Sequence, residues 1–172
     1  MKMFFRFVCV FLSFISIAFC VSCSNGNNVI SVSVTEISMA ISAAVPLDEG
    51  YYSASDSYCK YYFKDENGGA LLGNIVGAEN WTVQKSKSQS SENEFGIFIT
   101  DKKSVSTVKS VCEKYIETRK NAYMDAKAAY SPDEYEKFRD AEVFVSENYV
   151  MYFIMTKSDV TIAKKSVSAL FE

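Results

Sequence analysis

The sequence predicts an α+β fold: a four-stranded antiparallel sheet of two hairpins, each followed by a helix, with the helices packed on one face. Three observations support this prediction. The chain has 172 residues, the size of one ordinary domain. Its composition, 48% hydrophobic with only two prolines, is typical of a packed core. Pairs of β-rich segments also alternate with helical patterns along the second half of the chain.

Two features of the composition exclude large classes of function. The chain has no histidine, which removes the usual general base at neutral pH, the commonest metal ligand and every Ser-His or Cys-His catalytic pair. Its net charge of −3 leaves no basic surface to neutralise a phosphate backbone. We therefore expect no nucleic-acid partner, no metal ion and no cofactor.

The N-terminus has the pattern of a secretory signal peptide. Lys2 and Arg6 precede an apolar run over residues 7–21, and a polar segment follows. The run is shorter than the roughly 20 residues of a membrane-spanning helix, although an uncleaved anchor is an alternative. Removal of residues 1–22 leaves 16 Lys and Arg against 21 Asp and Glu, a net charge of −5. Charge would therefore not hold the mature chain on an anionic membrane.

The first predicted helix covers residues 36–45. Thr35 and Glu36 favour a helix start, and Pro46 ends the helix. The preceding residues 29–34 alternate like a strand or simply lead into this helix. The tyrosine- and glycine-rich part that follows has no clear period, so its structure is not predicted.

A first hairpin and a long helix come next. Residues 81–85 and 95–100 are β-rich and flank a polar loop. Asp101 then caps a helix predicted over residues 103–129, in which apolar side chains recur at spacings of three and four and Arg119 is the interruption. We expect this helix to cover one face of the sheet.

A second hairpin and a helix close the chain. A short helix begins at Pro132, because proline favours the first helical position. The β-rich segments 141–146 and 149–155 are separated by a two-residue turn. Ser158 or Asp159 then caps a C-terminal helix.

The segment Cys20-Val21-Ser22-Cys23 resembles a bacterial lipobox. The resemblance implies cleavage just before Cys23 and a lipid on that cysteine, with at least two acyl chains for stable anchoring. The chain then divides into a lipoprotein signal peptide over residues 1–22, a lipid-anchored tether over residues 23–34 and one α+β domain over residues 35–172. The expected location is the extracytoplasmic face of the cell membrane. Ordinary secretion with cleavage a few residues later is the alternative.

Several motifs resemble a domain-of-unknown-function family of small lipoproteins found mainly in Gram-positive anaerobes. They are the stretch Tyr-Ser-Pro-Asp-Glu-Tyr-Glu-Lys that begins at Tyr130, the Ala-Glu-Val strand after it, and Glu147-Asn148-Tyr149. The segment that begins at Ala43 is similar to the end of the family's opening helix. The resemblance covers most of the mature chain and implies a lipid-anchored extracytoplasmic α+β domain with no assigned activity.

Cys59 and Cys112 would remain in the domain after cleavage and lipidation. A disulfide between them is one interpretation, since the expected location is outside the cytoplasm. Two buried free thiols are the other, because Cys112 lies on the apolar side of the long predicted helix.

The candidate binding residues are tyrosines, which offer a flat apolar face with a hydroxyl at its edge and suit a carbohydrate or a peptide. They are Tyr51, Tyr52, Tyr58, Tyr61 and Tyr62. Packing in the core is the competing interpretation. A second candidate surface is an exposed apolar patch for a partner, formed by Leu71, Leu72, Ile75 and Val76.

The catalytic and metal motifs are weak. Ser57-x-x-Lys60 and Ser106-x-x-Lys109 match the nucleophile motif of penicillin-binding enzymes, but chance matches are expected in a chain rich in serine and lysine, and no Lys-Thr-Gly follows. The segment 65–68 begins like a calcium loop but lacks its closing glutamate, which favours a solvated turn.

These patterns together predict a non-enzymatic binding or interaction module of the cell envelope. Its expected partners are the membrane, through the lipid anchor, and an envelope protein or a wall glycan. The alternative is an envelope enzyme or accessory that acts on a glycan with carboxylates alone, which requires no histidine. Such an enzyme would present two carboxylates about 5–10 Å apart across a cleft.

Overall fold

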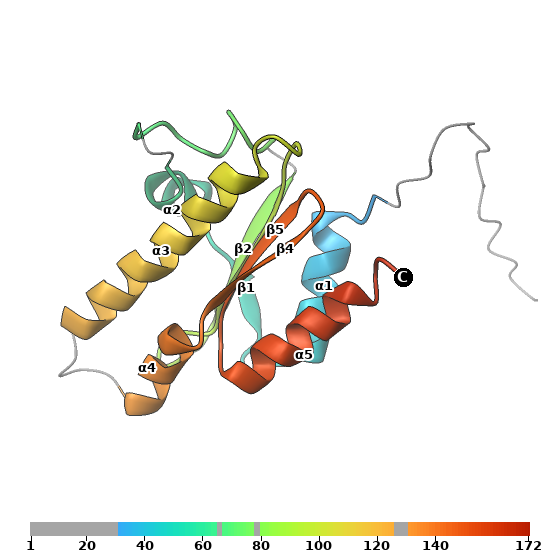
Figure 1. Ribbon diagram of the computed structural model, residues 1–172. Coiled ribbons are helices and arrows are strands. Elements are labelled where there is room, and N and C mark those ends of the chain that lie inside the picture. Colours follow the sequence, from blue (N-terminus) through green and yellow to red (C-terminus); the bar gives the residue numbers. More distant parts are fainter. Residues whose placement is uncertain (1–30, 65–66, 78–79, 126–130) are drawn as a thin grey trace, which may run out of the picture.

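The computed structural model describes residues 31–64, 67–77, 80–125 and 131–172. Over these ranges the chain forms an open antiparallel sheet of five strands, in the order β1-β2-β3-β5-β4, and five helices (Figure 1). The α+β class and both predicted hairpins are confirmed. The predicted signal peptide and Cys23 lie outside the described residues.

The helices are α1 (Val34–Ala44), α2 (Asp56–Tyr62), α3 (Val105–Asp125), α4 (Pro132–Arg139) and α5 (Lys157–Ser168). The strands are β1 (Tyr51–Ser53), β2 (Trp81–Ser86), β3 (Glu94–Ile99), β4 (Glu142–Ser146) and β5 (Tyr149–Ile154).

The sheet has one strand more than predicted. The additional strand is β1, which pairs antiparallel with β2 through Tyr51 opposite Ser86 and Ser53 opposite Gln84. It is only three residues long and has no alternating pattern, so pairing with β2, rather than its own sequence, determines its conformation.

The helices cover both faces of the sheet, which corrects the prediction of a single covered face. In Figure 1, α2, α3 and α4 lie on one side of the strands, and α1 and α5 lie on the other. The reason is visible in β5, whose six residues are all buried. A strand that is apolar at every position, rather than at every second one, requires cover on both faces.

Two helix starts differ from the predictions. Helix α1 begins two residues early, because Ser33 and not Thr35 is its N-cap and forms a capping box with Glu36. Val32 and Val34, which fall within the predicted tether, are buried in the core. Helix α5 is capped by Thr156 and not by Ser158 or Asp159: the Thr156 hydroxyl accepts a hydrogen bond from the Asp159 amide.

The other predicted signals act as expected. The Asp101 carboxylate accepts hydrogen bonds from the Lys103 and Ser104 amides, at 2.8 and 2.9 Å, ahead of α3. Pro132 opens α4. The tight turn between β4 and β5 places Glu147 at a φ of 51°. The predicted end of the long helix, residues 126–129, lies outside the described residues.

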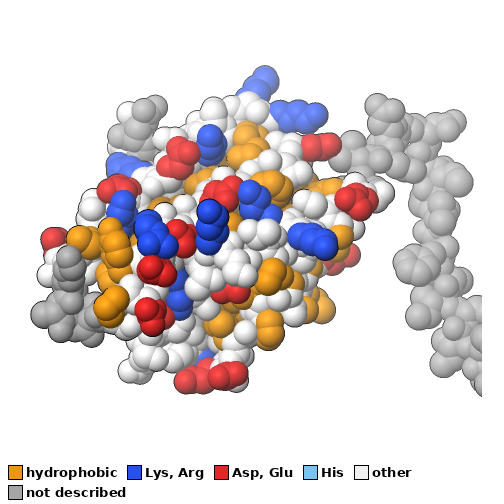
Figure 2. Space-filling view, turned by 60° about the horizontal axis from the view of Figure 1, so that its bottom comes forward, with side chains coloured by type: hydrophobic (Ala, Val, Ile, Leu, Met, Phe, Trp, Pro, Cys, Tyr) orange, Lys and Arg blue, Asp and Glu red, His pale blue; other side chains and the backbone are white. Residues whose placement is uncertain are grey.

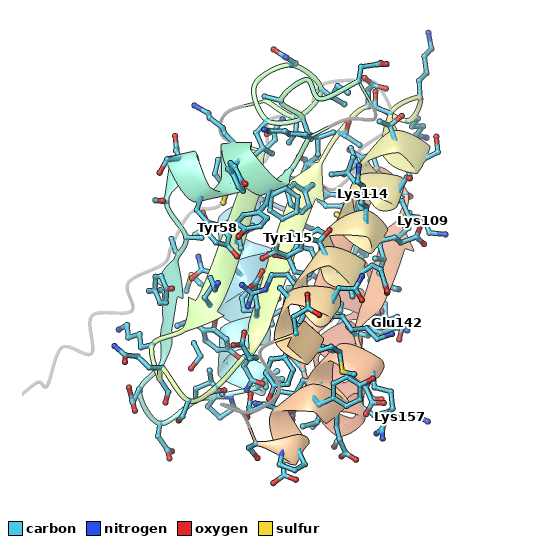
Figure 3. All side chains as sticks on the ribbon, turned by 90° about the vertical axis from the view of Figure 1, so that its left-hand side faces the viewer. Tyr58, Lys109, Lys114, Tyr115, Glu142 and Lys157 are labelled. Carbon is cyan, nitrogen blue, oxygen red and sulfur yellow. The ribbon has the colours of Figure 1, made fainter. Side chains whose placement is uncertain are left out.

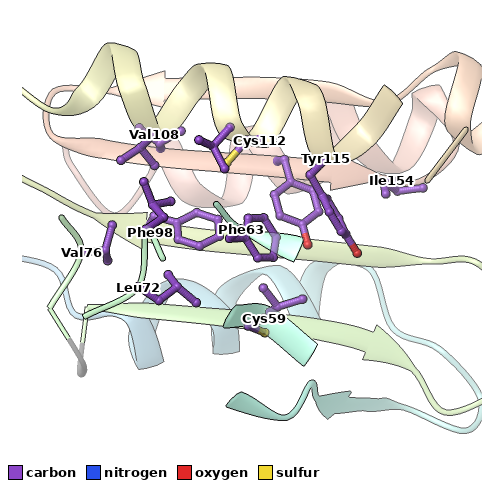
Figure 4. Close-up of a cluster of buried hydrophobic side chains, with 14 of the residues drawn as sticks. Cys59, Phe63, Leu72, Val76, Phe98, Val108, Cys112, Tyr115 and Ile154 are labelled. Carbon is purple, nitrogen blue, oxygen red and sulfur yellow. The ribbon is translucent and has the colours of Figure 1, made fainter. Parts of the chain in front are cut away.

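The core consists of one cluster on each face of the sheet. The cluster below α2 and α3 is centred on Phe63, whose ring contacts Phe98 and Tyr115 (Figure 4). Cys59 and Cys112 both belong to this cluster, and both are free thiols, so the disulfide interpretation is wrong. The cluster below α1 and α5 includes Phe95, Ile97, Met151 and Phe153.

The surface carries mixed charge. On the face shown in Figure 2, acidic and basic side chains are intermixed and do not form a large patch of one sign. None of the described helices combines the length and the apolar character needed to cross a bilayer.

Candidate functional site

An open groove of about 450 Å³ lies between α2 and α3. This volume falls in the range of about 300–1,000 Å³ that is typical of small-ligand sites. The groove is lined by Tyr61, Tyr62, Lys64, Val111, Lys114, Tyr115 and Thr118. Figure 3 looks onto α2 and α3 and shows Tyr58 and Tyr115 between them, with Lys114 on α3.

The α2 side of the groove is a stack of aromatic rings. Tyr62 contacts Tyr58 at 4.7 Å and Tyr61 at 4.9 Å between ring centroids, and its edge meets Tyr115 at 5.7 Å. Tyr61 is 66% exposed, so most of its side chain is accessible to a ligand. The Lys64 ammonium lies 5.0 Å from the centre of the Tyr61 ring.

A buried carboxylate supports this groove from below. Glu94, at the start of β3, is completely buried and accepts hydrogen bonds from the hydroxyls of Tyr115 at 2.6 Å and Tyr152 at 2.5 Å. Tyr115 donates its only proton to Glu94, so at the 2.7 Å contact between Tyr58 and Tyr115 the Tyr58 hydroxyl is the donor.

Two cations complete this network. Lys85 lies opposite Glu94 in the sheet, and its ammonium is 3.4 Å from the Glu94 carboxylate and 3.1 Å from the Tyr58 hydroxyl. Arg119 of α3 donates to the Tyr58 hydroxyl at 3.2 Å and forms an ion pair with Glu92. Two carboxylates and two cations therefore balance, as buried charges must.

The network shifts the pKa values of its members in directions that preserve it. Burial and the nearby Glu94 carboxylate raise the pKa of Tyr58, Tyr115 and Tyr152, so these hydroxyls remain protonated donors. For Lys85 burial is the largest single effect and acts to lower the pKa, but the Glu94 carboxylate and the Tyr58 hydroxyl together outweigh it, so the pKa is raised. The pKa of Arg119 is raised by the same balance.

The sequence interpretation overlooked this network, although it contained signals of it. Arg119 interrupts the apolar side of the long helix, and a charge at such a position is buried only with a partner. Glu94 directly precedes the apolar run of β3, but its position next to a polar loop led to its assignment to that loop. The pairing of Glu94 with Lys85 depends on strand register, which the sequence does not show.

The five candidate tyrosines do not form one site. Tyr61 and Tyr62 line the groove, and Tyr58 belongs to the network beneath it. Tyr51 lies on the other face of the sheet, where its ring packs edge-on against Phe95 and its hydroxyl donates to the Val45 carbonyl. Tyr52 is 46% exposed on the short edge strand β1.

The second candidate surface is wrong as an exposed patch. Leu71, Leu72 and Val76 are all buried and belong to the cluster centred on Phe63. Ile75 packs against the same cluster. The glycines in this segment allow it to turn compactly over the sheet: Gly73, at a φ of 91°, occupies a conformation that favours glycine.

The serine–lysine motifs do not form catalytic pairs. Lys60 and Lys109 instead form surface ion pairs with Asp56 and Glu113. A different serine contacts a lysine: the Ser91 hydroxyl accepts a hydrogen bond from Lys137 at 3.1 Å. Lys137 also donates to both oxygens of Glu134, at 2.7 and 2.9 Å, so its ammonium group is engaged in an ion pair.

Two carboxylates, Glu92 and Glu94, lie on either side of Arg119. They do not match the open pair that a glycan-cleaving enzyme requires. The guanidinium lies between them, and the Glu94 side chain is only 1% exposed, so a substrate has no access to it. Two carboxylates of α4 are likewise engaged, since Glu134 is paired with Lys137 and Glu136 with Arg139.

A second hollow, of about 280 Å³, lies where β4 begins beside α5. Its walls include Glu142 and Lys164, which form an ion pair, and no aromatic side chain. No group of three or more His, Cys, Asp or Glu side chains suited to a metal ion occurs in the described parts of the chain. Residues 65 and 66 of the calcium-like segment lie outside them.

The fold and the site together define an α+β domain with an aromatic groove over a buried charge network. Residues 77–155 match the family described as Domain of unknown function (DUF4358). This stretch contains both hairpins with α3 and α4, and it leaves α1, β1, α2 and α5 outside. Comparison with curated proteins and with solved structures gives no match.

Proposed function

We propose that this protein is a lipid-anchored binding module of the cell envelope. It is held by Cys23 on the extracytoplasmic face of the membrane and recognises an envelope component through the groove between α2 and α3. Support for the location comes from the charged N-terminus, the apolar run and the lipobox-like segment that ends at Cys23. A non-enzymatic role is favoured because the buried carboxylates and cations are paired with one another rather than directed at a substrate.

The observation that carries the proposal is the exposed Tyr61 ring on a rigid base. Binding sites work best when their contact residues are held in place before the ligand arrives. Here Tyr61 packs on Tyr62, and Tyr62 packs on Tyr58 and Tyr115. The Tyr115 hydroxyl donates to Glu94, and the Tyr58 hydroxyl donates to Tyr115. The aromatic side chains of the groove are therefore held in place by contacts that extend down to the sheet.

Metabolic labelling with a palmitate analogue tests the anchor. Wild-type protein is expected to carry label and to sediment with membranes, and Cys23→Ala is expected to lose both. An unlabelled, freely secreted wild-type protein would contradict the anchor.

Co-sedimentation with isolated cell envelopes tests the groove. The full-length protein, kept in detergent so that its lipid has no bilayer to enter, is mixed with detergent-extracted envelopes, with and without their remaining proteins. Tyr61→Ala and Lys114→Glu are expected to reduce the bound fraction. Lys109→Glu is the matched control, because Lys109 lies on the same helix, does not line the groove and points away from α2 (Figure 3). Equal binding by all four proteins would exclude the groove as the recognition surface.

A further inference from the structure

We infer that the groove between α2 and α3 binds an anionic glycan, with a sugar ring on Tyr61 and an acidic group between Lys64 and Lys114. This inference rests on the proposed binding function and adds the chemical class of the ligand. Three features of the groove lead to it: its charge, its exposed ring and the shape of its floor.

The charge of the groove differs from that of its surroundings. On the outer surfaces of α2 and α3, Lys60, Lys109 and Lys120 each have a carboxylate partner within one helical turn. Lys64 and Lys114, the two lysines that line the groove, have no carboxylate within ion-pair distance among the described residues. Two exposed ammonium groups on opposite walls are a positive pair in an acidic chain, and they complement a negative ligand group.

The exposed ring selects for a flat, partly apolar ligand. The Tyr61 side chain is largely exposed to solvent, and the Lys64 ammonium lies 5.0 Å from the centre of its ring. A ligand with a sugar ring that carries a carboxylate satisfies both groups at once, because its C–H face packs on the aromatic ring while its charge reaches the ammonium.

The floor of the groove disfavours an extended acidic peptide. It is formed by the side chains of Val111 and Tyr115 on α3, and the Tyr115 hydroxyl is already bonded to Glu94. The lining residues belong to α2 and α3, except Lys64 just after α2, and none belongs to a strand of the sheet, so no edge of the sheet is available to pair with a peptide backbone. Recognition must therefore come from a ring face and from charge.

Titration calorimetry with defined probes tests the inference on the full-length protein in detergent. The probes are hexagalacturonate, which joins sugar rings to carboxylates, maltohexaose, which lacks charge, and hexaglutamate, which lacks sugar rings. Hexagalacturonate alone is expected to bind, and added salt is expected to weaken its binding. Lys114→Glu should weaken the affinity by about tenfold, and Lys109→Glu by less than about twofold.

Each other outcome overturns the inference. Equal binding of maltohexaose would show that charge does not matter, and equal binding of hexaglutamate would identify an acidic peptide as the ligand. If no probe binds while envelope co-sedimentation still depends on Lys114, the glycan class is wrong and the groove remains the recognition surface. If co-sedimentation is also independent of Lys114, the proposed function fails as well.

Discussion

At the scale of single residues, the buried Glu94 carboxylate organises one face of the molecule. Tyr115 and Tyr152 donate to it, and Lys85 lies beside it, so side chains from β2, β3, β5 and α3 converge at one point. A buried charge of this kind contributes little net stability when its partners are present, but its removal leaves those partners without a counter-charge. Its main effect is to fix the position of Tyr115 beneath the groove.

Glu94→Gln is therefore expected to destabilise the protein strongly. The substitution leaves the partly buried Lys85 and Arg119 with an incomplete set of counter-charges, which costs about 3 kcal/mol of unfolding free energy. Glu117→Gln is the matched control, because Glu117 pairs with Lys120 at the surface and should change stability by less than about 1 kcal/mol. Urea unfolding followed by circular dichroism measures both, and equal midpoints would contradict the expectation.

The buried thiols predict a loss of stability at alkaline pH. Burial raises the pKa of Cys59 from 9.0 to about 12. Between these values the unfolded chain has lost a proton that the native state keeps, so the unfolding free energy falls as pH rises, by about 1.4 kcal/mol per pH unit. Cys59→Ala should make this decline less steep between pH 9 and pH 11, and Cys112, whose pKa burial also raises, should account for part of what remains. Identical slopes for wild type and variant in urea unfolding would rule out the effect.

At the scale of elements, close contact between strands β3 and β5 depends on a glycine. Gly96 lies opposite Tyr152, and the Tyr152 ring covers the space that a side chain would need. A Cβ at position 96 would lie 2.1 Å from the Tyr152 ring, which is itself fully buried. The same ring donates to Glu94, so strand pairing and the charge network share one residue.

Gly96→Ala is expected to cost about 3 kcal/mol or more, because a rigid ring must move and its bond to Glu94 is lost. Gly68→Ala offers a comparison: nothing lies within 4 Å of its added Cβ, so its only cost is the positive φ of 79°. In thermal unfolding, Gly96→Ala should lower the midpoint temperature far more than Gly68→Ala does. A smaller effect at Gly96 than at Gly68 would show that Tyr152 adapts freely.

Helix α1 provides a test of local capping. Ser33→Ala removes the acceptor for the Glu36 amide and should cost about 1 kcal/mol. Thr35→Ala is the control, since Thr35 is exposed and does not cap the helix. The difference in urea midpoint between the two variants measures how much the cap contributes to stability. A larger loss of stability for Thr35→Ala than for Ser33→Ala would show that Thr35 is the cap, as the sequence alone predicts.

At the scale of the whole molecule, the two-sided cover of the sheet makes the terminal helices part of one folding unit. Ile37 and Ile41 of α1 and Ala163 and Val167 of α5 are fully buried on the face opposite the groove. The family-matched stretch, residues 77–155, lacks both helices. Without them, the buried face of β3 and β5 would be open to water.

Residues 77–155 expressed alone are therefore expected not to fold. The fragment would expose Phe95, Ile97, Met151 and Phe153, which favours association through apolar surface. Its proton NMR spectrum should lack the dispersed methyl signals that the whole chain shows. A monomeric fragment with cooperative thermal unfolding would prove that α1 and α5 are additions to an independent core.

The sequence by itself determined the local features of this protein. The α+β class, the two hairpins, the start of α4 at Pro132 and the capping role of Asp101 follow from propensity and periodicity, which act over a few residues. The signal peptide and the lipid on Cys23 stay predictions from the sequence.

Only the tertiary structure decided the fifth strand, the cover on both faces and the network around Glu94. Strand β1 exists because β2 offers it an edge, and Glu94 meets Lys85 and Arg119 only because strand register and the packing of α3 bring them together. These contacts join residues far apart in the chain, so no short pattern encodes them. The groove depends on the same long-range packing, since one wall belongs to α2 and the other to α3.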